Sequence, residues 1–349
     1  MPERVAITGA TGFVGSAVTR AFLNAGYAVR VLVRNSSPRA LLAGLEVEIT
    51  EADLAAPQTL SAALAGCTGL VHVAADYRLF VTDPASLYRV NVDGARALMQ
   101  AALAAGVRRV VYTSSVAALG HRVDAAPADE DTPATLAGMI GHYKRSKFLA
   151  EAEVSRLVTA SGLPAVIVNP SAPVGPRDLK PTPTGRMVLD AARGRMPAYL
   201  DTGLNIVHVD DVALGHLYAY QRGRIGRRYI LGGENLSLKD IFTALARLAG
   251  VRPPRLKLAP GLLMPFAGLA EFVARLTATT PRLTRDELHM ARYPMYYSCA
   301  RAERELGYTH RPAAAAFRDA LAWFAEHGYW RPRQGGWTAR QPRDGESSR

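Results

Sequence analysis

Residues 4–15 read Arg4-Val5-Ala6-Ile7-Thr8-Gly9-Ala10-Thr11-Gly12-Phe13-Val14-Gly15, and this stretch decides the fold. The run from Val5 to Ile7 predicts a buried strand, and a helical period of apolar residues follows the glycines until Gly26. A glycine-rich turn between a strand and a helix lets a pyrophosphate approach the backbone and lie at the helix N-terminus. The spacing is G-x-x-G-x-x-G, and a tight turn without a ligand is the alternative. We expect a dinucleotide site formed by Gly9, Thr11, Gly12, Phe13, Val14 and Gly15.

Strands and helices alternate through the first half of the chain. Further strands are expected at 28–33, 45–49, 69–74, 107–113 and 164–168, and helices at 87–105 and about 142–161. Because parallel strands need crossover helices, this order predicts an α/β fold built on a doubly wound parallel sheet of the Rossmann type.

The second half loses this alternation. Residues 170–204 are rich in proline and glycine and are expected to cross over the active site, whereas 205–221 and 228–231 are expected to return to the sheet domain. Helices from 236 onward would form a smaller, mostly helical C-terminal substrate lobe. The predicted domains are a dinucleotide-binding domain (1–170 plus about 205–232) and a substrate-binding lobe (about 171–204 plus 233–330). A flexible basic tail (331–349) would follow them.

The composition restricts the class of protein. The 349 residues carry a net charge of +12, but no basic run is interleaved with aromatic residues, so we expect no nucleic-acid partner. Cys67 and Cys299 lie far apart, without the spacing of a metal site or a disulfide framework, so we expect no metal and a reducing, cytoplasmic location. The N-terminus leads straight into the glycine turn, with no pattern of a signal peptide.

The most apolar stretch runs from Leu256 to Thr277. Pro265 breaks it and Glu271 interrupts it, so it is too short and too broken to span a bilayer. We expect a helix packed on the core, with a peripheral membrane contact as the alternative.

Tyr143 and Lys147 stand four residues apart in a predicted helix and therefore share one face. A lysine ammonium beside a phenol favours the phenolate, which suits a proton-transfer residue. Ser115 follows the strand that ends at Thr113, where the carboxyl ends of parallel strands line a ligand site. A serine there can hydrogen-bond a substrate oxygen, and an ordinary capping serine is the alternative.

These motifs resemble those of the extended short-chain dehydrogenases/reductases, from Val5 to about Tyr329. Besides the glycine turn, the matching residues are Asp53-Leu54, His72-Val73-Ala74-Ala75, Asn91, Thr113-Ser114-Ser115, Tyr143 with Lys147, and Asn169-Pro170-Ser171. Within that superfamily the chain is most similar to the hopanoid-associated sugar epimerases, bacterial relatives of dihydroflavonol 4-reductase. The residues typical of that branch are Asp76-Tyr77-Arg78, Met139 to Lys147, Pro173 to Asp178, Lys180 to Arg186, and His208 to Val212.

The resemblance implies a role for each matching residue. Tyr143 would be the acid/base, Lys147 its electrostatic partner and ribose anchor, and Ser115 the donor to the substrate oxygen. The implied cofactor contacts also include Asp53 and Leu54 at the adenine, Ala74 and Ala75 along the cofactor, Thr113, and Pro170, Ser171 and Pro173 at the nicotinamide. Asn91 would support the lysine through water, or else cap a helix. A homodimer is expected from the resemblance alone.

Arg34 and Arg39 bear on the choice of nicotinamide cofactor. An acidic residue about twenty positions after the glycines would bind the ribose 2′-hydroxyl of NAD, but this chain has Arg34 at the end of the second predicted strand. A guanidinium suits a 2′-phosphate, with Arg39 as a helper, and a surface arginine is the alternative. We therefore expect NADP(H) in preference to NAD(H).

The reaction stays open between three readings. A reductase gives a hydride to a ketone carbon while Tyr143 protonates the oxygen, and an epimerase oxidises a sugar hydroxyl and returns the hydride to the other face. Lys144 stands where sugar-nucleotide epimerases usually carry glycine, which favours an NADP(H)-dependent oxidoreductase on a sugar-like or polycyclic, hopanoid-linked substrate. A non-catalytic NADP-binding redox sensor is the third reading. The candidate substrate contacts are Asp76, Tyr77, Ser115, His142, Asn169, Arg186 and His208.

Overall fold

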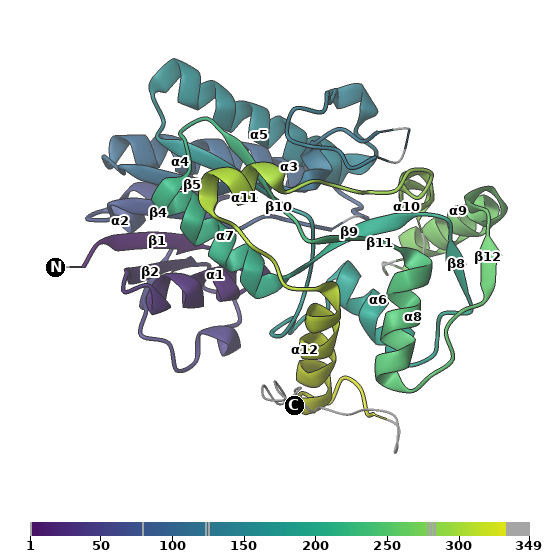
Figure 1. The fold of residues 1–349 in the computed structure, drawn as a ribbon. Coiled ribbons are helices and arrows are strands. Elements are labelled where there is room, and N and C mark those ends of the chain that lie inside the picture. Colours follow the sequence, from purple (N-terminus) through teal and green to yellow (C-terminus); the bar gives the residue numbers. More distant parts are fainter. Residues whose placement is uncertain are drawn as a thin grey trace, which may run out of the picture.

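The computed structural model describes residues 2–332, apart from residues 79, 123, 125, 278, 280, 282 and 283. Its centre is a seven-stranded sheet in the order β10-β6-β5-β4-β1-β2-β3, in which every neighbouring pair is parallel (Figure 1). Its strands are β1 (Arg4–Thr8), β2 (Ala28–Val33), β3 (Glu48–Glu51), β4 (Gly69–His72), β5 (Arg109–Thr113), β6 (Ala165–Pro170) and β10 (Arg228–Leu231). The predicted doubly wound parallel sheet is confirmed.

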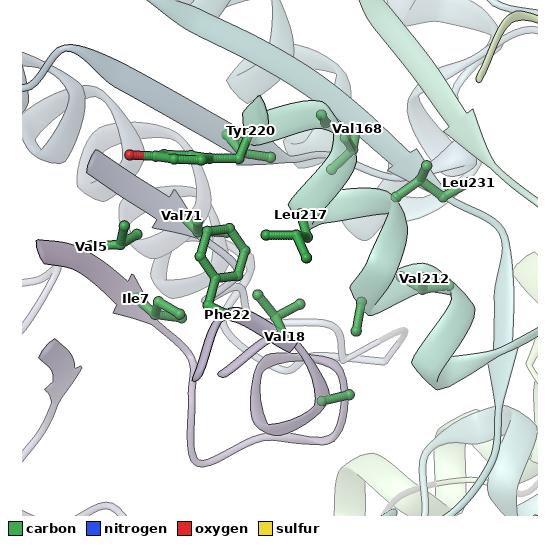
Figure 2. Packing of buried hydrophobic residues seen from close by; sticks show 14 of the residues in the cluster. Val5, Ile7, Val18, Phe22, Val71, Val168, Val212, Leu217, Tyr220 and Leu231 are labelled. Carbon is green, nitrogen blue, oxygen red and sulfur yellow. The ribbon is translucent and has the colours of Figure 1, made fainter. Parts of the chain in front are cut away.

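Helices cover both faces of this sheet. On one face α1 (Phe13–Asn24) packs against α7 (Val209–Arg222). The other face is covered by α2 (Leu60–Leu64), α4 (Ala95–Ala104) and α5 (Gly141–Ser161). Figure 2 shows the first core, where Phe22 of α1 lies between the sheet and Tyr220 of α7, with ring centroids 5.3 Å apart. Burial of these apolar side chains holds the layers together.

The strand order reverses between β1 and β4. In open α/β sheets ligands bind outside the carboxyl ends of the strands at such a reversal. The glycine turn follows β1, and Ala74 and Ala75 follow β4, so both lie at this point of the sheet. The topology therefore places the predicted dinucleotide site where the fold favours a ligand.

Several predicted elements differ from the structure by one or two residues at their ends, and two differ more. The strand predicted at 45–49 is β3 (Glu48–Glu51), because the amides of Leu45 and Val47 bond locally to the carbonyls of Leu42 and Leu45 instead of to β2. The helix predicted at 87–105 is divided into α3 (Pro84–Tyr88), a π-helical turn (Arg89–Gly94) and α4.

A smaller group of elements has its own apolar core. β7 (Ala172–Val174), β9 (Gly203–His208) and β11 (Glu234–Ser237) form a three-stranded sheet, and β8 (Ala198–Leu200) pairs with β12 (Leu256–Leu258). The core contains residues of α6 (Pro183–Ala192), α8 (Leu238–Ala249) and α12 (Ala313–Glu326). Residues 205–221 were expected to return to the main sheet. α7, which forms the second part of this segment, packs on the main sheet as expected. β9, which forms the first part, belongs instead to the smaller sheet. The predicted domain boundaries themselves stay predictions.

The remaining helices are α9 (Pro260–Thr277), α10 (Arg285–Met290) and α11 (Ala300–Leu306). α9 packs against α10, and Figure 1 shows both at the edge of the molecule, close to β12. α11 packs on α7 and β10, so this late segment contacts the main sheet domain. In the part of the chain that the structure describes, no helix could cross a membrane. Most of the tail predicted at 331–349 lies outside the described residues.

Candidate active site

The glycine turn joins β1 to α1 in a conformation that needs glycine. Gly9 has a φ of 73°, and a Cβ on it would lie 2.7 Å from the backbone nitrogen of Ala74. A Cβ on Gly15 would overlap the carbonyl oxygen of Gly9. Gly12 is the N-cap of α1 and brings no side-chain oxygen, so the first-turn amides remain available to an anion. The turn can therefore receive a diphosphate.

Unpartnered polar atoms at the same edge of the sheet also point to a ligand. Among the described residues, the buried atoms Ser114 Oγ, Asn169 Oδ1 and Ser171 Oγ have no hydrogen-bond partner. Ser114 follows β5, Asn169 lies in β6 and Ser171 follows β6. Buried polar groups in native proteins are nearly always satisfied, so a polar ligand is expected here. Together with the glycine turn, these atoms fit a nicotinamide dinucleotide.

Thr8 ties the first strand to the chain beyond β4. Its hydroxyl lies 2.7 Å from Nδ1 of His72 and accepts hydrogen bonds from the amides of Val73 and Ala74, both at 3.1 Å. Burial, and to a lesser degree the charge of Lys147, lower the pKa of His72 to about 3. The imidazole is therefore neutral and accepts a hydrogen bond from the Thr8 hydroxyl. The oxygen of that hydroxyl accepts the amide hydrogen bond that holds Ala74 beside the glycine turn.

Ser115, Tyr143 and Lys147 meet at the carboxyl end of β5, as the sequence predicted. The Lys147 ammonium is buried and donates a hydrogen bond of 2.8 Å to the carbonyl oxygen of Thr113. Burial lowers its pKa to about 8. Burial raises the pKa of Tyr143, and a hydrogen bond with Ser115 opposes that rise. Ser115 also caps the turn Val116–Ala118, so both roles considered for it are compatible.

A buried carboxylate behind this group was not predicted. Glu151 lies one turn after Lys147 on α5, and its charge raises the lysine pKa against the effect of burial. It accepts a hydrogen bond of 2.8 Å from Nδ2 of Asn169 and one of 3.3 Å from Arg228. The same Nδ2 donates to the carbonyl oxygen of Ser115 at 3.0 Å. Its position four residues after Lys147 was the available signal, because that spacing places both on one helix face.

Asn91 lies inside the π-helical turn, so the helix-capping alternative is wrong. Its Nδ2 donates to the carbonyl oxygen of Asp76 at 2.8 Å and to the Ser146 hydroxyl at 3.0 Å, and its Oδ1 accepts from the amide of Asp76. Ser146 in turn donates to the carbonyl oxygen of Tyr143. Asn91 thus links the segment after β4 to α5, and its predicted cofactor contact stays a prediction.

The residues predicted for the adenosine end follow neighbouring strands. Arg34 is exposed directly after β2, and Arg39 is exposed in the loop that follows. Asp53 and Leu54 follow β3, and the side chain of Asp53 accepts a hydrogen bond from the backbone amide of Ala55. All four therefore follow the carboxyl ends of β2 and β3, the two strands that continue the sheet from β1.

Two predicted substrate residues, Tyr77 and Arg186, lie near each other. Tyr77 is about half exposed. Partial burial raises its pKa, and the charges of Asp178 and Arg186 lie close enough to act on it as well. Asp178 is buried, accepts hydrogen bonds from the amide and hydroxyl of Thr182, and has its pKa raised by burial to about 6. It was not predicted, although an acid four residues before a helix-capping threonine was a local signal.

The other predicted substrate residues are already engaged. Asp76 forms an ion pair with Arg78, and the exposed His142 lies 3.2 Å from the hydroxyl of Tyr88. Asn169 keeps only Oδ1 for a ligand. His208 is a correction. Its side chain is buried, it caps α7 through the amide of Asp210, and Nε2 lies 3.1 Å from Asp319. Both ring nitrogens are used, so it offers no donor or acceptor to a substrate.

One group of metal-ligand side chains occurs in the described part of the chain. Ligand atoms of Cys299, Glu303 and His310 lie within 4.8 Å of one another. Burial raises the pKa of the Cys299 thiol to about 12, and the thiol donates to Glu303. The group lies around α11, and the chemistry of the predicted site does not require it.

Comparison with known proteins supports the fold as described. Residues 5–232 match the model of the NAD dependent epimerase/dehydratase family. A putative dihydroflavonol 4-reductase of Synechocystis sp. is 43% identical over 93% of this chain and 95% of its own length. Sterol demethylase protein B of Methylococcus capsulatus is 38% identical over 92% of this chain and 98% of its own. The crystal structure of gox2253 superposes with a TM-score of 0.85 and 54% identity, over 93% of this chain and 99% of that one.

Proposed function

This chain belongs to the NAD dependent epimerase/dehydratase family of extended short-chain dehydrogenases/reductases, and from that membership we propose that it is an NADP(H)-dependent carbonyl/alcohol oxidoreductase. Its substrate is sugar-like or polycyclic and hopanoid-linked, and Tyr143 is the acid/base. The proposal rests mainly on one observation, that Ser115, Tyr143 and Lys147 lie together at the end of β5.

The three residues divide the work on the substrate. A bound nicotinamide supplies or accepts the hydride. Ser115 donates a hydrogen bond to the reacting oxygen, and Tyr143 transfers the proton at its phenolic oxygen. Lys147, one helical turn after Tyr143 on the same face of α5, supplies a positive charge that favours the phenolate left after proton donation. Its hydrogen bond to Thr113 fixes that charge in the site.

The preference for NADP(H) is supported by charge. Between Val33 and Arg39 the chain has two arginines and no carboxylate. Arg34 is exposed where β2 ends, so its guanidinium can form charge-assisted hydrogen bonds with a 2′-phosphate. The absence of an acid in this segment removes the usual acceptor for a ribose 2′-hydroxyl.

The substrate class is supported by the site and by one relative. Tyr77 presents an aromatic face, and Arg186 and Asp178 lie near it, so the region can contact both rings and hydroxyl groups. The relative named for sterol demethylation extends over nearly the whole chain. A polycyclic alcohol or ketone satisfies both observations.

A sugar epimerase is the second candidate, because the matching family model is named for epimerases and dehydratases. An epimerase keeps its cofactor between two half-reactions, whereas a reductase exchanges it at each turnover. The test is to denature the purified protein and identify released nicotinamide by chromatography and absorbance, and then to follow NADPH consumption with cyclic ketones. Protein that is empty, binds NADPH reversibly and consumes it with a ketone supports the proposal. Stoichiometric bound NAD(P), together with no NADPH consumption in the presence of ketones, would favour the epimerase over the reductase.

A further inference from the structure

The outer face of α9 is an apolar stripe. Six large apolar side chains on this helix are between 47% and 72% exposed: Leu262, Phe266, Leu269, Phe272, Val273 and Leu276. Their spacing of three, four or one residues places them on one side of the helix. Helices of globular proteins normally turn such a face to the core, so an exposed stripe marks an interaction surface.

The opposite side of α9 is anchored, so the stripe cannot simply rotate inward. Ala267 and Ala274 are buried, and a Cβ on Gly268 would overlap the guanidinium of Arg285. Glu271 accepts a hydrogen bond of 2.7 Å from the backbone amide of Arg285 at the start of α10. Small residues and one hydrogen bond thus hold α9 on α10.

Basic residues precede the stripe in the chain, and β12, which carries one of them, lies close to α9 (Figure 1). Between residues 247 and 277 the chain has five basic residues and one acidic residue, Glu271. Arg247, Arg252 and Arg255 are exposed, and Lys257 is exposed although it pairs with Asp201 at 2.6 Å. The exposed Leu256 stands among these cations. An apolar stripe beside an excess of positive charge is complementary to the surface of an anionic lipid bilayer.

We propose that α9 is a peripheral membrane anchor, whose stripe enters the headgroup region of an anionic bilayer while the arginines at 247–255 contact the lipid phosphates. Such docking does not depend on the reaction. Where the proposed function holds, docking would also bring a polycyclic lipid close to the site, because α9 packs on α10 and α10 lies beside the start of α5. A Cβ on Gly141, two residues before Tyr143, would lie 2.6 Å from Asp286 of α10.

The test is co-sedimentation of the full chain with vesicles of phosphatidylcholine that contain 30% phosphatidylglycerol, compared with phosphatidylcholine alone. We expect binding to the anionic vesicles that weakens as salt is raised. The double variant Phe266→Ser/Phe272→Ser should weaken binding at least about tenfold. Arg252→Glu/Arg255→Glu should also weaken binding at least about tenfold, because cations near an anionic surface favour binding. Ile225→Ser, which removes an exposed apolar side chain outside α9, is the matched control and should bind like the wild type.

Three results would overturn the inference. The first is no vesicle binding by the wild-type chain, and the second is binding that the Phe266→Ser/Phe272→Ser variant retains in full. The third is a loss of self-association in that variant, measured by sedimentation velocity without lipid, which would assign the stripe to a second copy of the chain. None of these measurements uses substrate or cofactor, so they fail or succeed separately from the proposed reaction.

Discussion

The ammonium of Lys147 donates a hydrogen bond of 2.8 Å to the carbonyl oxygen of Thr113, and this bond joins α5 to the end of β5. On its other sides the lysine meets the ring of Tyr112, with Nζ 5.2 Å from the centroid, and the charge of Glu151. The cation is therefore held in a buried position at the end of β5, two residues before Ser115, by the helix that also carries Tyr143.

Replacing Tyr143 with phenylalanine should remove the acid/base and leave the fold intact. We expect kcat to fall by about 10²–10⁴-fold, the usual contribution of a positioned general acid, while the affinity for NADPH changes little. Steady-state kinetics and a fluorescence titration of NADPH measure the two quantities. Tyr88→Phe, which removes an exposed hydroxyl near His142, is the control. Unchanged activity in the Tyr143 variant would favour the redox-sensor reading.

Replacing Glu151 with glutamine should shift the alkaline limit of activity. The pKa of Lys147 is about 8, so its charge is lost as the pH rises through that value and kcat should fall. Glu151 favours the ammonium, and without its charge the fall should begin at a pH lower by about one unit. A pH profile of kcat measures the shift. Glu153→Gln on the same helix, which pairs with Arg96 and Arg156, should leave the profile in place.

Replacing Arg34 with aspartate should reverse the cofactor preference. Hydrogen bonds to charged groups contribute about 1.5–3 kcal/mol, so the affinity for NADPH relative to NADH should fall by roughly 10–100-fold. Titrations with both nucleotides give the ratio. Arg224→Asp, at an exposed arginine before β10, is the matched control. If the ratio is the same in both variants, Arg34 does not recognise the 2′-phosphate.

Replacing Gly15 with alanine should abolish dinucleotide binding, because its Cβ would overlap the carbonyl oxygen of Gly9 and displace the turn. The matched control is Gly261→Ala, since a Cβ on Gly261 meets no atom within 4 Å. The Gly261→Ala variant should raise the free energy of unfolding by up to about 1 kcal/mol, because alanine favours a helix more than glycine does. NADPH titration and thermal unfolding measure the two effects. Wild-type affinity in the Gly15 variant would contradict the assignment of the turn.

Acid should destabilise the protein through two buried neutral histidines. Burial lowers the pKa of His216 to about 4 and that of His72 to about 3, both below the value near 6.5 of an unfolded chain. Between pH 6.5 and 4 the unfolded chain therefore binds more protons, and the free energy of unfolding falls as the pH falls.

His216→Gln isolates one of these contributions. His216 lies 2.9 Å from the Thr113 hydroxyl and 2.7 Å from the carbonyl oxygen of Val212. We expect the variant to be less stable at pH 7 but to lose about 2–3 kcal/mol less than the wild type between pH 6.5 and 4. Urea unfolding at several pH values measures the slope, and the exposed His142→Gln is the control. An unchanged slope in the His216 variant would contradict a neutral buried histidine.

The parts of the site that follow from local spacing could be predicted. Gly9, Gly12 and Gly15 bracket the junction of one strand and one helix, and Tyr143 and Lys147 are one helical turn apart. Such relations depend on a few adjacent residues, so the sequence alone expresses them. The polar candidates were harder to predict, because the sequence around His208 is the same whether its side chain caps a helix or faces a ligand.

The sequence by itself determined the alternation of strands and helices, the glycine turn and the pairing of a tyrosine with a lysine, because hydrophobic period and backbone freedom are local properties. Only the tertiary structure decided that Asn169 bridges Glu151 and Ser115, that β9 pairs in the smaller sheet, and that the buried His208 contacts Asp319. These contacts join residues from 18 to 111 positions apart. They depend on which surfaces pack together, and packing is settled by the whole core rather than by any one segment.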